Sequence, residues 1–245
     1  MIKVEGLTKS FGRQAVLRGL DLDVPDGSIT VIIGRSGGGK SVFLRHLLGL
    51  VRPDAGRIVI DGVDVTGLTG RAFDQVRERY GVVFQGGALF DSLTCAGNVA
   101  FPLREKTRLP RAEIVARVTR GLEQVGLGDV GDKYPAEVSG GMRKRVAIAR
   151  ALVTEPAVVF FDEPTTGLDP ILVNTIHGLI RELHRRLRFT AVVVSHEIPE
   201  IFELADTVAM LHEGRIVEIG PPEAIQASSN PIVQQFIRGE PEVRI

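Results

Sequence analysis

Uninterrupted apolar segments mark the strands at the centre of the predicted fold. Residues 29–33, 157–161 and 191–194 consist almost entirely of Ile, Val, Phe and Ala, a pattern typical of strands buried on both faces of a parallel sheet. The segment 170–187 instead repeats apolar residues at helical spacing and carries arginines on the other side of the expected helix. Strands combined with helices in this way predict an α/β domain.

Two other segments depart from this core. Residues 2–24 alternate between apolar and polar positions with turn residues between them, which predicts short antiparallel strands. Residues 88–153 have helical character, and one helix is expected to start at Pro110. Its predicted apolar face comprises Val115, Val118, Leu122 and Val125.

The predicted organisation is one large domain, residues 1–220, interrupted by a helical insertion. We expect its core at 1–87 and 154–220, the helical subdomain at about 88–153, and a C-terminal extension at 221–245. A short strand is expected at 82–84, and the extension is expected to contain a short helix near 232–238.

Composition narrows the class of protein. The 245 residues carry 30 basic and 30 acidic side chains, so no overall field favours nucleic acid, and we expect no nucleic-acid partner. No apolar run approaches the ~20 residues needed to cross a bilayer. The first five residues do not resemble a signal peptide, and Cys95 is the only cysteine, so we expect it to be a buried apolar residue. A soluble cytoplasmic protein, or a peripheral subunit of a larger assembly, is expected.

A glycine-rich loop supplies the strongest chemical signal. Residues 34–41 read Gly-Arg-Ser-Gly-Gly-Gly-Lys-Ser and satisfy the pattern G-x-x-x-x-G-K-[ST] between a buried strand and a predicted helix. Glycines allow the tight turn that points successive N–H groups at an anion, and the positive end of the helix faces the same point. Lys40 is expected to reach the β- and γ-phosphates and Ser41 to bind Mg²⁺. The sequence therefore predicts a nucleoside triphosphate site.

Other polar residues follow strand ends or precede helices. Asp162 and Glu163 end a buried strand, where open α/β sheets place their sites, and His196 follows another. Gln85 ends a short strand, although alone it is a weak signal. Ser139 and two glycines open a helix, which fits either an anion site or an ordinary N-cap. For His196, a ligand and a structural residue remain equally open.

Phe11, in an expected loop before the glycine-rich segment, is a candidate for stacking on a purine base. Ordinary packing of the ring is the alternative.

Together these motifs resemble the ATP-binding cassette (ABC) ATPase family along almost the whole chain. The resemblance rests on six elements in one order with characteristic separations. They are residues 34–41, Gln85, Ser139-Gly140-Gly141, residues 160–163, Asp169 and His196. The resemblance implies a P-loop NTPase (RecA-like) core with an antiparallel β-subdomain and an inserted α-helical subdomain.

The same resemblance implies ATP and Mg²⁺ as cofactors and assigns the site residues. ATP would contact Phe11, Gly34, Arg35, Ser36, Gly37, Gly38, Gly39, Lys40, Ser41, Val42, Ser139, Gly140, Gly141 and Asp169. The metal would be held by Ser41, Gln85 and Asp162. The catalytic set would be Glu163, which polarises the attacking water, and His196, Gln85 and Lys40.

Family members work as pairs, so the resemblance also implies a homodimer. Each ATP would lie between the glycine-rich loop of one copy and Ser139-Gly140-Gly141 of the other. The family usually has Leu-Ser-Gly-Gly-Gln at this signature, whereas this chain has Val138 at the start and Met142 at the end. Hydrolysis is expected to persist because the serine and both glycines are retained.

The altered signature at 139–145 is similar to that of the ATPases of Mla/Mce-type lipid transporters. Four further segments resemble the same subgroup, namely residues 85–94, 98–105, 194–200 and 231–236. That similarity implies phospholipid or lipid transport in bacteria, driven at the cytoplasmic face of the inner membrane through an integral-membrane permease. The permease is expected to dock near Phe90 and Leu93, although these residues could instead cap the helical subdomain's own core. Mce-domain and small accessory proteins are further expected partners, and the lipid itself is not expected to bind this chain.

Other functions remain open. An importer of a polar solute or an exporter of another hydrophobic compound would use an equivalent motor. A non-transport ABC ATPase is less favoured because such proteins usually carry tandem cassettes or a long coiled coil. A solitary P-loop kinase or switch would leave Ser139-Gly140-Gly141 and His196 unexplained.

Overall fold

A computed structural model describes residues 1–240, which form two compact units. The first unit combines Met1–Arg77 with the described chain from Thr190 onward, and the second is Glu78–Phe189. The expected helical subdomain, about 88–153, falls within the second unit, which begins earlier and ends later. The expected domain limits stay a prediction.

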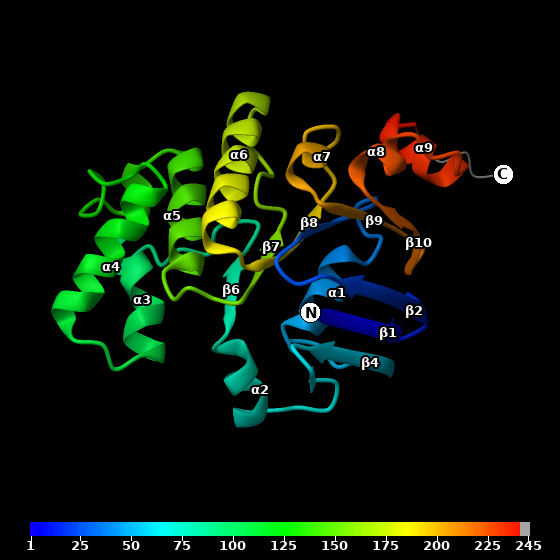
Figure 1. The fold of residues 1–245 in the computed structure, drawn as a ribbon, viewed down its shortest axis with the longest axis horizontal. Helices are drawn as coiled ribbons and strands as arrows, with labels where there is room; N and C mark the ends of the chain where they lie inside the picture. The colour runs from blue at the N-terminus through cyan, green and yellow to red at the C-terminus, as the bar shows by residue number, and fades with distance from the viewer. Residues whose placement is uncertain (241–245) are drawn as a thin grey trace. The chain divides into compact units, whose positions relative to one another are not determined.

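The first unit contains the predicted antiparallel sheet near the N-terminus (Figure 1). Its strands are β1 (Ile2–Phe11), β2 (Gln14–Val24), β4 (Ala55–Ile60) and β5 (Val63–Asp64), in the order β2-β1-β4-β5. Alternate residues of β1, including Ile2 and Val4, are buried. The alternation in the sequence therefore reflects a sheet with one face in the core.

The first unit also contains the strand that leads into the glycine-rich loop. In this part of the unit β3 (Ile29–Ile33) lies between β8 (Thr190–Ser195) and β9 (Thr207–His212), parallel to both, and β10 (Arg215–Gly220) pairs with β9. All five residues of β3 are buried, which explains why four of the five are apolar. The helices of the unit are α1 (Lys40–Leu47), α2 (Arg71–Arg77), α7 (Ile201–Leu204), α8 (Pro222–Gln226) and α9 (Pro231–Ile237).

The second unit places helices around a parallel strand pair, β6 (Tyr80–Val83) and β7 (Val158–Asp162). The helices are α3 (Cys95–Lys106), α4 (Arg111–Gln124), the short η1 (Pro135–Glu137), α5 (Gly140–Leu152) and α6 (Pro170–Leu187). Tyr80 and Phe160 meet edge to face with ring centroids 5.0 Å apart, which ties the two strands together. No helix in residues 1–240 is long and apolar enough to cross a membrane.

Several local predictions were wrong. Val115 is exposed, whereas Val118, Leu122 and Val125 are buried as expected. The strand predicted at 82–84 is β6 at Tyr80–Val83, and Phe84 lies exposed beyond its end. Sequence patterns also gave no sign of α2 and α8, because their short length leaves too few turns for a helical period to show.

Candidate nucleotide-binding site

The glycine-rich loop connects β3 to α1 in the first unit and has a backbone that only glycine can supply. A Cβ on Gly34 would lie 2.3 Å from the carbonyl oxygen of Leu211 in β9, so no side chain fits there. Gly37 and Gly39 have φ angles of 77° and 102°, in the left-handed region. These glycines therefore serve both close packing and the tight turn that the sequence predicted.

Lys40 opens α1 and folds back over this loop. Its side chain is only 4% exposed, and its Nζ donates to the carbonyl oxygens of Gly34 at 2.7 Å and Arg35 at 2.9 Å. The first N–H groups of a helix have no partner within the helix, so the ammonium group and the start of α1 both favour an anion here. Ser41 and Val42 follow in the first turn and are half-buried. This donor set fits a phosphate chain.

Gln85 and Glu163 are brought together in the second unit, although 78 positions separate them. Glu163 directly follows the end of β7 and has a φ of 47°, an uncommon left-handed conformation for a residue with a side chain. Its Oε2 accepts hydrogen bonds from Gln85 Nε2 at 3.0 Å and from Thr166 Oγ1 at 3.1 Å. The carboxylate is therefore held by two donors beside Asp162, the last residue of the strand.

Ser139 is an N-cap, the more ordinary of the two roles that its sequence allowed. Its Oγ accepts the N–H of Met142 at 3.3 Å, and α5 continues from Gly140 and Gly141. The Ser139 residue itself is exposed at this helix end, so its hydroxyl is accessible from solvent.

Asp169 has a similar role at the start of α6. Its Oδ1 accepts the N–H groups of Ile171 and Leu172 at 3.1 and 3.0 Å. The side chain of Leu172 packs within 3.5 Å of where a Cβ on Gly141 would be, which places the two capped helix starts side by side. The structure thus brings Asp169 together with the Ser139 motif.

His196 follows β8 in the first unit and faces the same pocket as part of the glycine-rich loop. The pocket has a volume of about 510 Å³ and is lined by Arg35, Ser36, His196, Ile198 and residues 236–240. Arg35 Nη2 donates to the carbonyl oxygen of Glu240 at 2.9 Å. No sequence pattern indicated that the C-terminal segment would contact this loop.

Phe11 ends β1 and is 49% exposed, with Lys9 Nζ 5.6 Å from its ring centroid. The ring is therefore open to stack on a purine base, and it is not packed into the core of the first unit.

The residues expected to bind Mg²⁺ are distributed over both units. Ser41 lies in the first unit, and Gln85 and Asp162 lie in the second. Within residues 1–240 no three His, Cys, Asp or Glu side chains form a metal-binding cluster. A hydroxyl, an amide and one carboxylate are oxygen donors that suit Mg²⁺, which also keeps water and phosphate oxygens as ligands.

Sequence reasoning missed Asn98, a fully buried residue of α3. Its Oδ1 accepts the N–H of Phe90 at 2.7 Å, and its Nδ2 donates to the carbonyl oxygens of Phe90, Leu93 and Thr94. One side chain therefore fixes the loop at 90–94. A buried asparagine in a helix has no distinctive sequence pattern, so only the contacts reveal this role.

Phe90 and Leu93, expected together at one docking surface, face two different grooves. Phe90 lines a groove of about 440 Å³, called here the aromatic groove. Its main walls are Tyr80, Phe84, Phe90, Phe101, Pro102, Lys106 and Arg150. Leu93 instead lines a groove of about 610 Å³ beside α3 and α4, together with Val115 and Tyr134.

Cationic side chains in the aromatic groove are partly removed from water. Burial lowers the pKa of Lys106 and of Arg150, with no carboxylate bonded to the Arg150 guanidinium among the described residues.

Burial also raises the pKa of the Cys95 thiol, which makes it a poor nucleophile, as expected of a buried cysteine.

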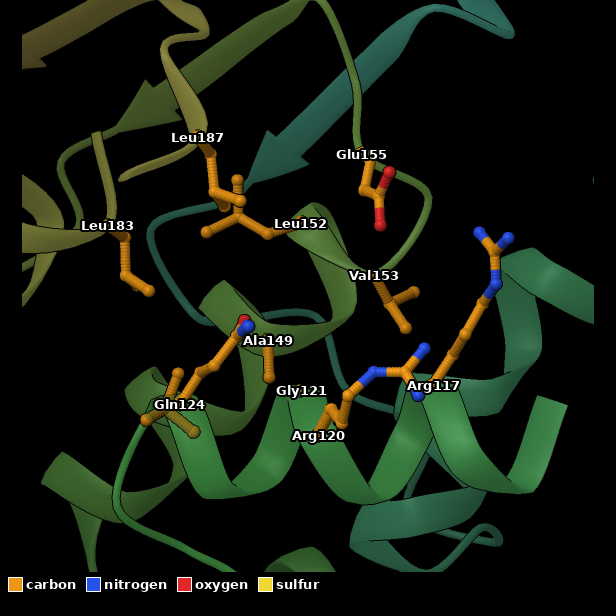
Figure 2. A pocket seen from close by; sticks show the side chains of 11 residues that line it. Arg117, Arg120, Gly121, Gln124, Ala149, Leu152, Val153, Glu155, Leu183 and Leu187 are labelled. Carbon is orange, nitrogen blue, oxygen red and sulfur yellow. The ribbon is translucent and has the colours of Figure 1, made fainter. Parts of the chain in front are cut away.

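A small cavity between α4, α5 and α6 has no part in the predicted site (Figure 2). Its volume is about 40 Å³, enough for a few water molecules at most. Figure 2 shows Leu152 and Val153 of α5 and Leu183 of α6 around it, with Arg117 and Arg120 rising from α4. None of the expected site residues lines this space.

Comparison with known proteins places this geometry in a family. Residues 17–166 match the ABC transporter family. The chain is 42% identical over 238 residues to a probable ribonucleotide transport ATP-binding protein of Mycobacterium leprae, covering 97% of this chain and 69% of that protein. It is 40% identical over 240 residues to the intermembrane phospholipid transport ATP-binding protein MlaF of Haemophilus influenzae, covering 98% of this chain and 91% of that protein.

A solved structure of an ATP-binding cassette has the same fold as this chain. The dimeric, post-hydrolysis cassette MJ0796 bound to ADP and Pi superimposes with a TM-score of 0.82 at 30% identity, over 91% of this chain and 99% of that chain. The chain belongs to the ABC transporter ATP-binding family. It is the ATP-hydrolysing, nucleotide-binding subunit of such a transporter and uses ATP with Mg²⁺. The P-loop NTPase fold expected from the sequence is thereby confirmed.

Proposed function

We propose that this chain powers the movement of phospholipid or a related lipid by a bacterial membrane permease, working as a homodimer at the cytoplasmic face of the inner membrane. The observation that carries the motor assignment is Lys40, buried over the glycine-rich loop with its ammonium group at the start of α1. The relative named for intermembrane phospholipid transport supports the lipid, and it matches this chain over almost its full length.

The proposed phosphate contacts come from the first unit. Residues 34–42 surround the phosphate chain, with Lys40 at the β- and γ-phosphates and Ser41 at the metal. Phe11 stacks on the adenine, and its exposed ring leaves a face open for this contact. Arg35 and Ser36 line the pocket that also contains His196, which supports a role for His196 at the γ-phosphate.

The proposed chemistry centres on Glu163. Its carboxylate accepts a proton from the attacking water while Gln85 and Thr166 hold its Oε2 in place. Ser41, Asp162 and Gln85 would hold Mg²⁺, which would supply positive charge against the phosphates. Phosphoryl transfer depends mainly on positioning and charge stabilisation, so the fixed carboxylate, lysine and histidine account for the protein's contribution.

A second copy of the chain completes each site. Ser139, Gly140 and Gly141 lie at an exposed helix start in the second unit. The cap is a serine and the first turn of α5 carries no acidic residue, so an anion can approach it. We assign these residues and Asp169 to the γ-phosphate side of the partner's nucleotide. The dimeric structure of the similar cassette MJ0796 supports this arrangement.

The permease is proposed to insert a cytoplasmic segment into the aromatic groove. Phe90 is 44% exposed, and its ring lies 4.7 Å from that of Phe101, so two rings present apolar surface to solvent. The docking expected near both Phe90 and Leu93 is therefore assigned to the Phe90 side. Mce-domain and small accessory proteins are proposed as further members of the assembly.

Transport of a ribonucleotide or another polar solute is the competing function, because of the name of the mycobacterial relative. The deciding experiment is purification of the tagged chain from membranes, with mass spectrometry of the lipids and proteins that accompany it. Enrichment of phospholipid with a lipid-type permease is expected. A polar-solute permease without lipid enrichment would overturn the lipid assignment.

A further inference from the structure

The loop that follows β6 is attached to α5 by two cationic side chains. We call residues 84–88 the Gln85 loop. Lys144, which is 8% exposed, donates from Nζ to the backbone carbonyl oxygen of Gln85. Arg150 donates from Nη2 to Gly87 O at 2.6 Å and from Nη1 to Ala88 O at 2.7 Å. Three carbonyl groups of the loop therefore face one helix.

These contacts hold a backbone that would not adopt its shape by itself. Ala88 has a φ of 46°, a region that residues with a Cβ seldom occupy, and Gly87 beside it has a φ of 77°. The N–H of Gly87 also closes a tight turn onto Phe84 O at 2.8 Å. Such conformations persist where neighbouring groups fix them, and here the fixing groups are the side chains of α5.

The same loop reaches the carboxylate proposed to activate water. Gln85 is attached to α5 through its backbone and to Glu163 through its side chain, with Nε2 3.0 Å from Oε2. A shift of the loop would therefore move the amide that holds this carboxylate. A misplacement of about 1 Å in such a group can cost a reaction about 100-fold in rate.

We propose that Lys144 and Arg150 are positioning residues for ATP hydrolysis, which act by fixing the Gln85 loop so that Gln85 orients Glu163. The proposal rests on the proposed function, in which Glu163 activates the attacking water. Ser139 caps α5 at its start, and Arg150 near the end of the same helix also lines the aromatic groove. The two cations therefore connect the capped helix start and the aromatic groove to the carboxylate.

Steady-state ATPase measurements on the full chain test the proposal. Lys144→Met removes the donor but keeps an unbranched side chain, and we expect kcat to fall about 10- to 100-fold with KM for ATP nearly unchanged. Lys144→Gln keeps an N–H donor and should restore most of the rate. Equal activity of Lys144→Met and the parent would overturn the proposal.

The matched control is Arg145→Met on the same helix. Arg145 also donates to a backbone carbonyl, that of Val125 at 3.3 Å, but Val125 lies at the end of α4, away from the Gln85 loop. This variant should keep the parental kcat. A similar loss of kcat in Arg145→Met would show that any weakened α5 contact slows the enzyme, and the proposal would fail.

A double-mutant cycle separates positioning from general damage. If Lys144 acts through Gln85, adding Lys144→Met to Gln85→Ala should reduce kcat no further. If the fold-losses in kcat of the two single variants multiply in the double variant, the proposal is contradicted. If Lys144→Met does not fold, Arg150→Lys provides the same test, because it keeps the charge but loses the two-pronged contact with Gly87 and Ala88.

Glu163→Gln distinguishes the positioning role of Lys144 and Arg150 from the proposed role of Glu163 in hydrolysis. If Glu163→Gln keeps the parental turnover, the proposed role of Glu163 is wrong. If Glu163→Gln abolishes turnover while Lys144→Met and Arg150→Lys match the parent, only the positioning proposal fails.

Discussion

The side-chain amide of Gln85 donates a hydrogen bond to the carboxylate of Glu163 across 3.0 Å. These residues follow two neighbouring parallel strands, β6 and β7, whose carboxyl ends meet at the same edge. The amide therefore fixes the position of the carboxylate that is proposed to activate water.

Replacing Glu163 with Gln should stop turnover and leave ATP binding intact. The amide keeps the shape of the side chain but cannot accept a proton, and loss of general-base assistance typically costs about 10²–10⁴-fold in rate. Steady-state phosphate release and equilibrium binding of a fluorescent ATP analogue measure the two effects. Size-exclusion chromatography with ATP should show a longer-lived dimer, and parental turnover would rule out the assigned role.

Lys40→Ala should weaken ATP binding about 10- to 100-fold, because a charged hydrogen-bond donor to phosphate is lost. The two carbonyls that now accept from Lys40 Nζ would also lose this donor, so the loop should become less ordered. Isothermal titration with ATP and with AMP tests the change. The loss should be confined to ATP, since AMP lacks the phosphates that Lys40 is expected to reach.

Phe90→Ser should release the permease and spare basal ATPase activity, since it removes half of the exposed ring pair with Phe101. Leu93→Ser is a matched control from the same loop that changes the other groove. Co-purification of the permease from membranes gives the readout. If Leu93→Ser releases the permease and Phe90→Ser does not, the docking site belongs to the groove beside α3 and α4.

Stability should fall as pH decreases below about 6.5 because of His46. Burial lowers the pKa of this histidine from 6.5, with Lys9 also opposing its charge. The unfolded chain therefore takes up a proton at a pH where the folded chain does not, and the contribution present above 6.5 is lost on acidification. The thermal unfolding midpoint of His46→Leu should fall less between pH 7.5 and 5.5 than that of the parent.

Local patterns predicted the fold and much of the candidate site. The glycine-rich loop could be recognised because its glycines, lysine and flanking strand are contiguous, and β3 is apolar at every position except Thr30 because both faces are covered. Ser139 could be identified as a helix start for the same reason. Each of these features depends on residues that are close in sequence.

Contacts between distant residues could not be predicted in this way. Arg35 meets Glu240 across 205 positions, and Lys144 reaches a backbone carbonyl 59 positions away. A carbonyl group is present in every residue, so nothing in the sequence marks which one a cation will bind. The prediction for Val115 was wrong for a related reason. Periodicity identifies an apolar stripe but does not show how far along the helix the covering elements extend.

The carbonyl groups of the glycine-rich loop provide Lys40 with hydrogen-bond acceptors when no nucleotide is bound. In its proposed role, the ammonium group would transfer its hydrogen bonds from the carbonyls of Gly34 and Arg35 to phosphate oxygens and return them when product leaves. Nucleotide exchange then replaces one set of acceptors with another, so the lysine is never left as a bare buried charge. On the proposed role of Lys40, this exchange would ease the departure of ADP and phosphate, which matters to a motor that must release its product before it can bind ATP again.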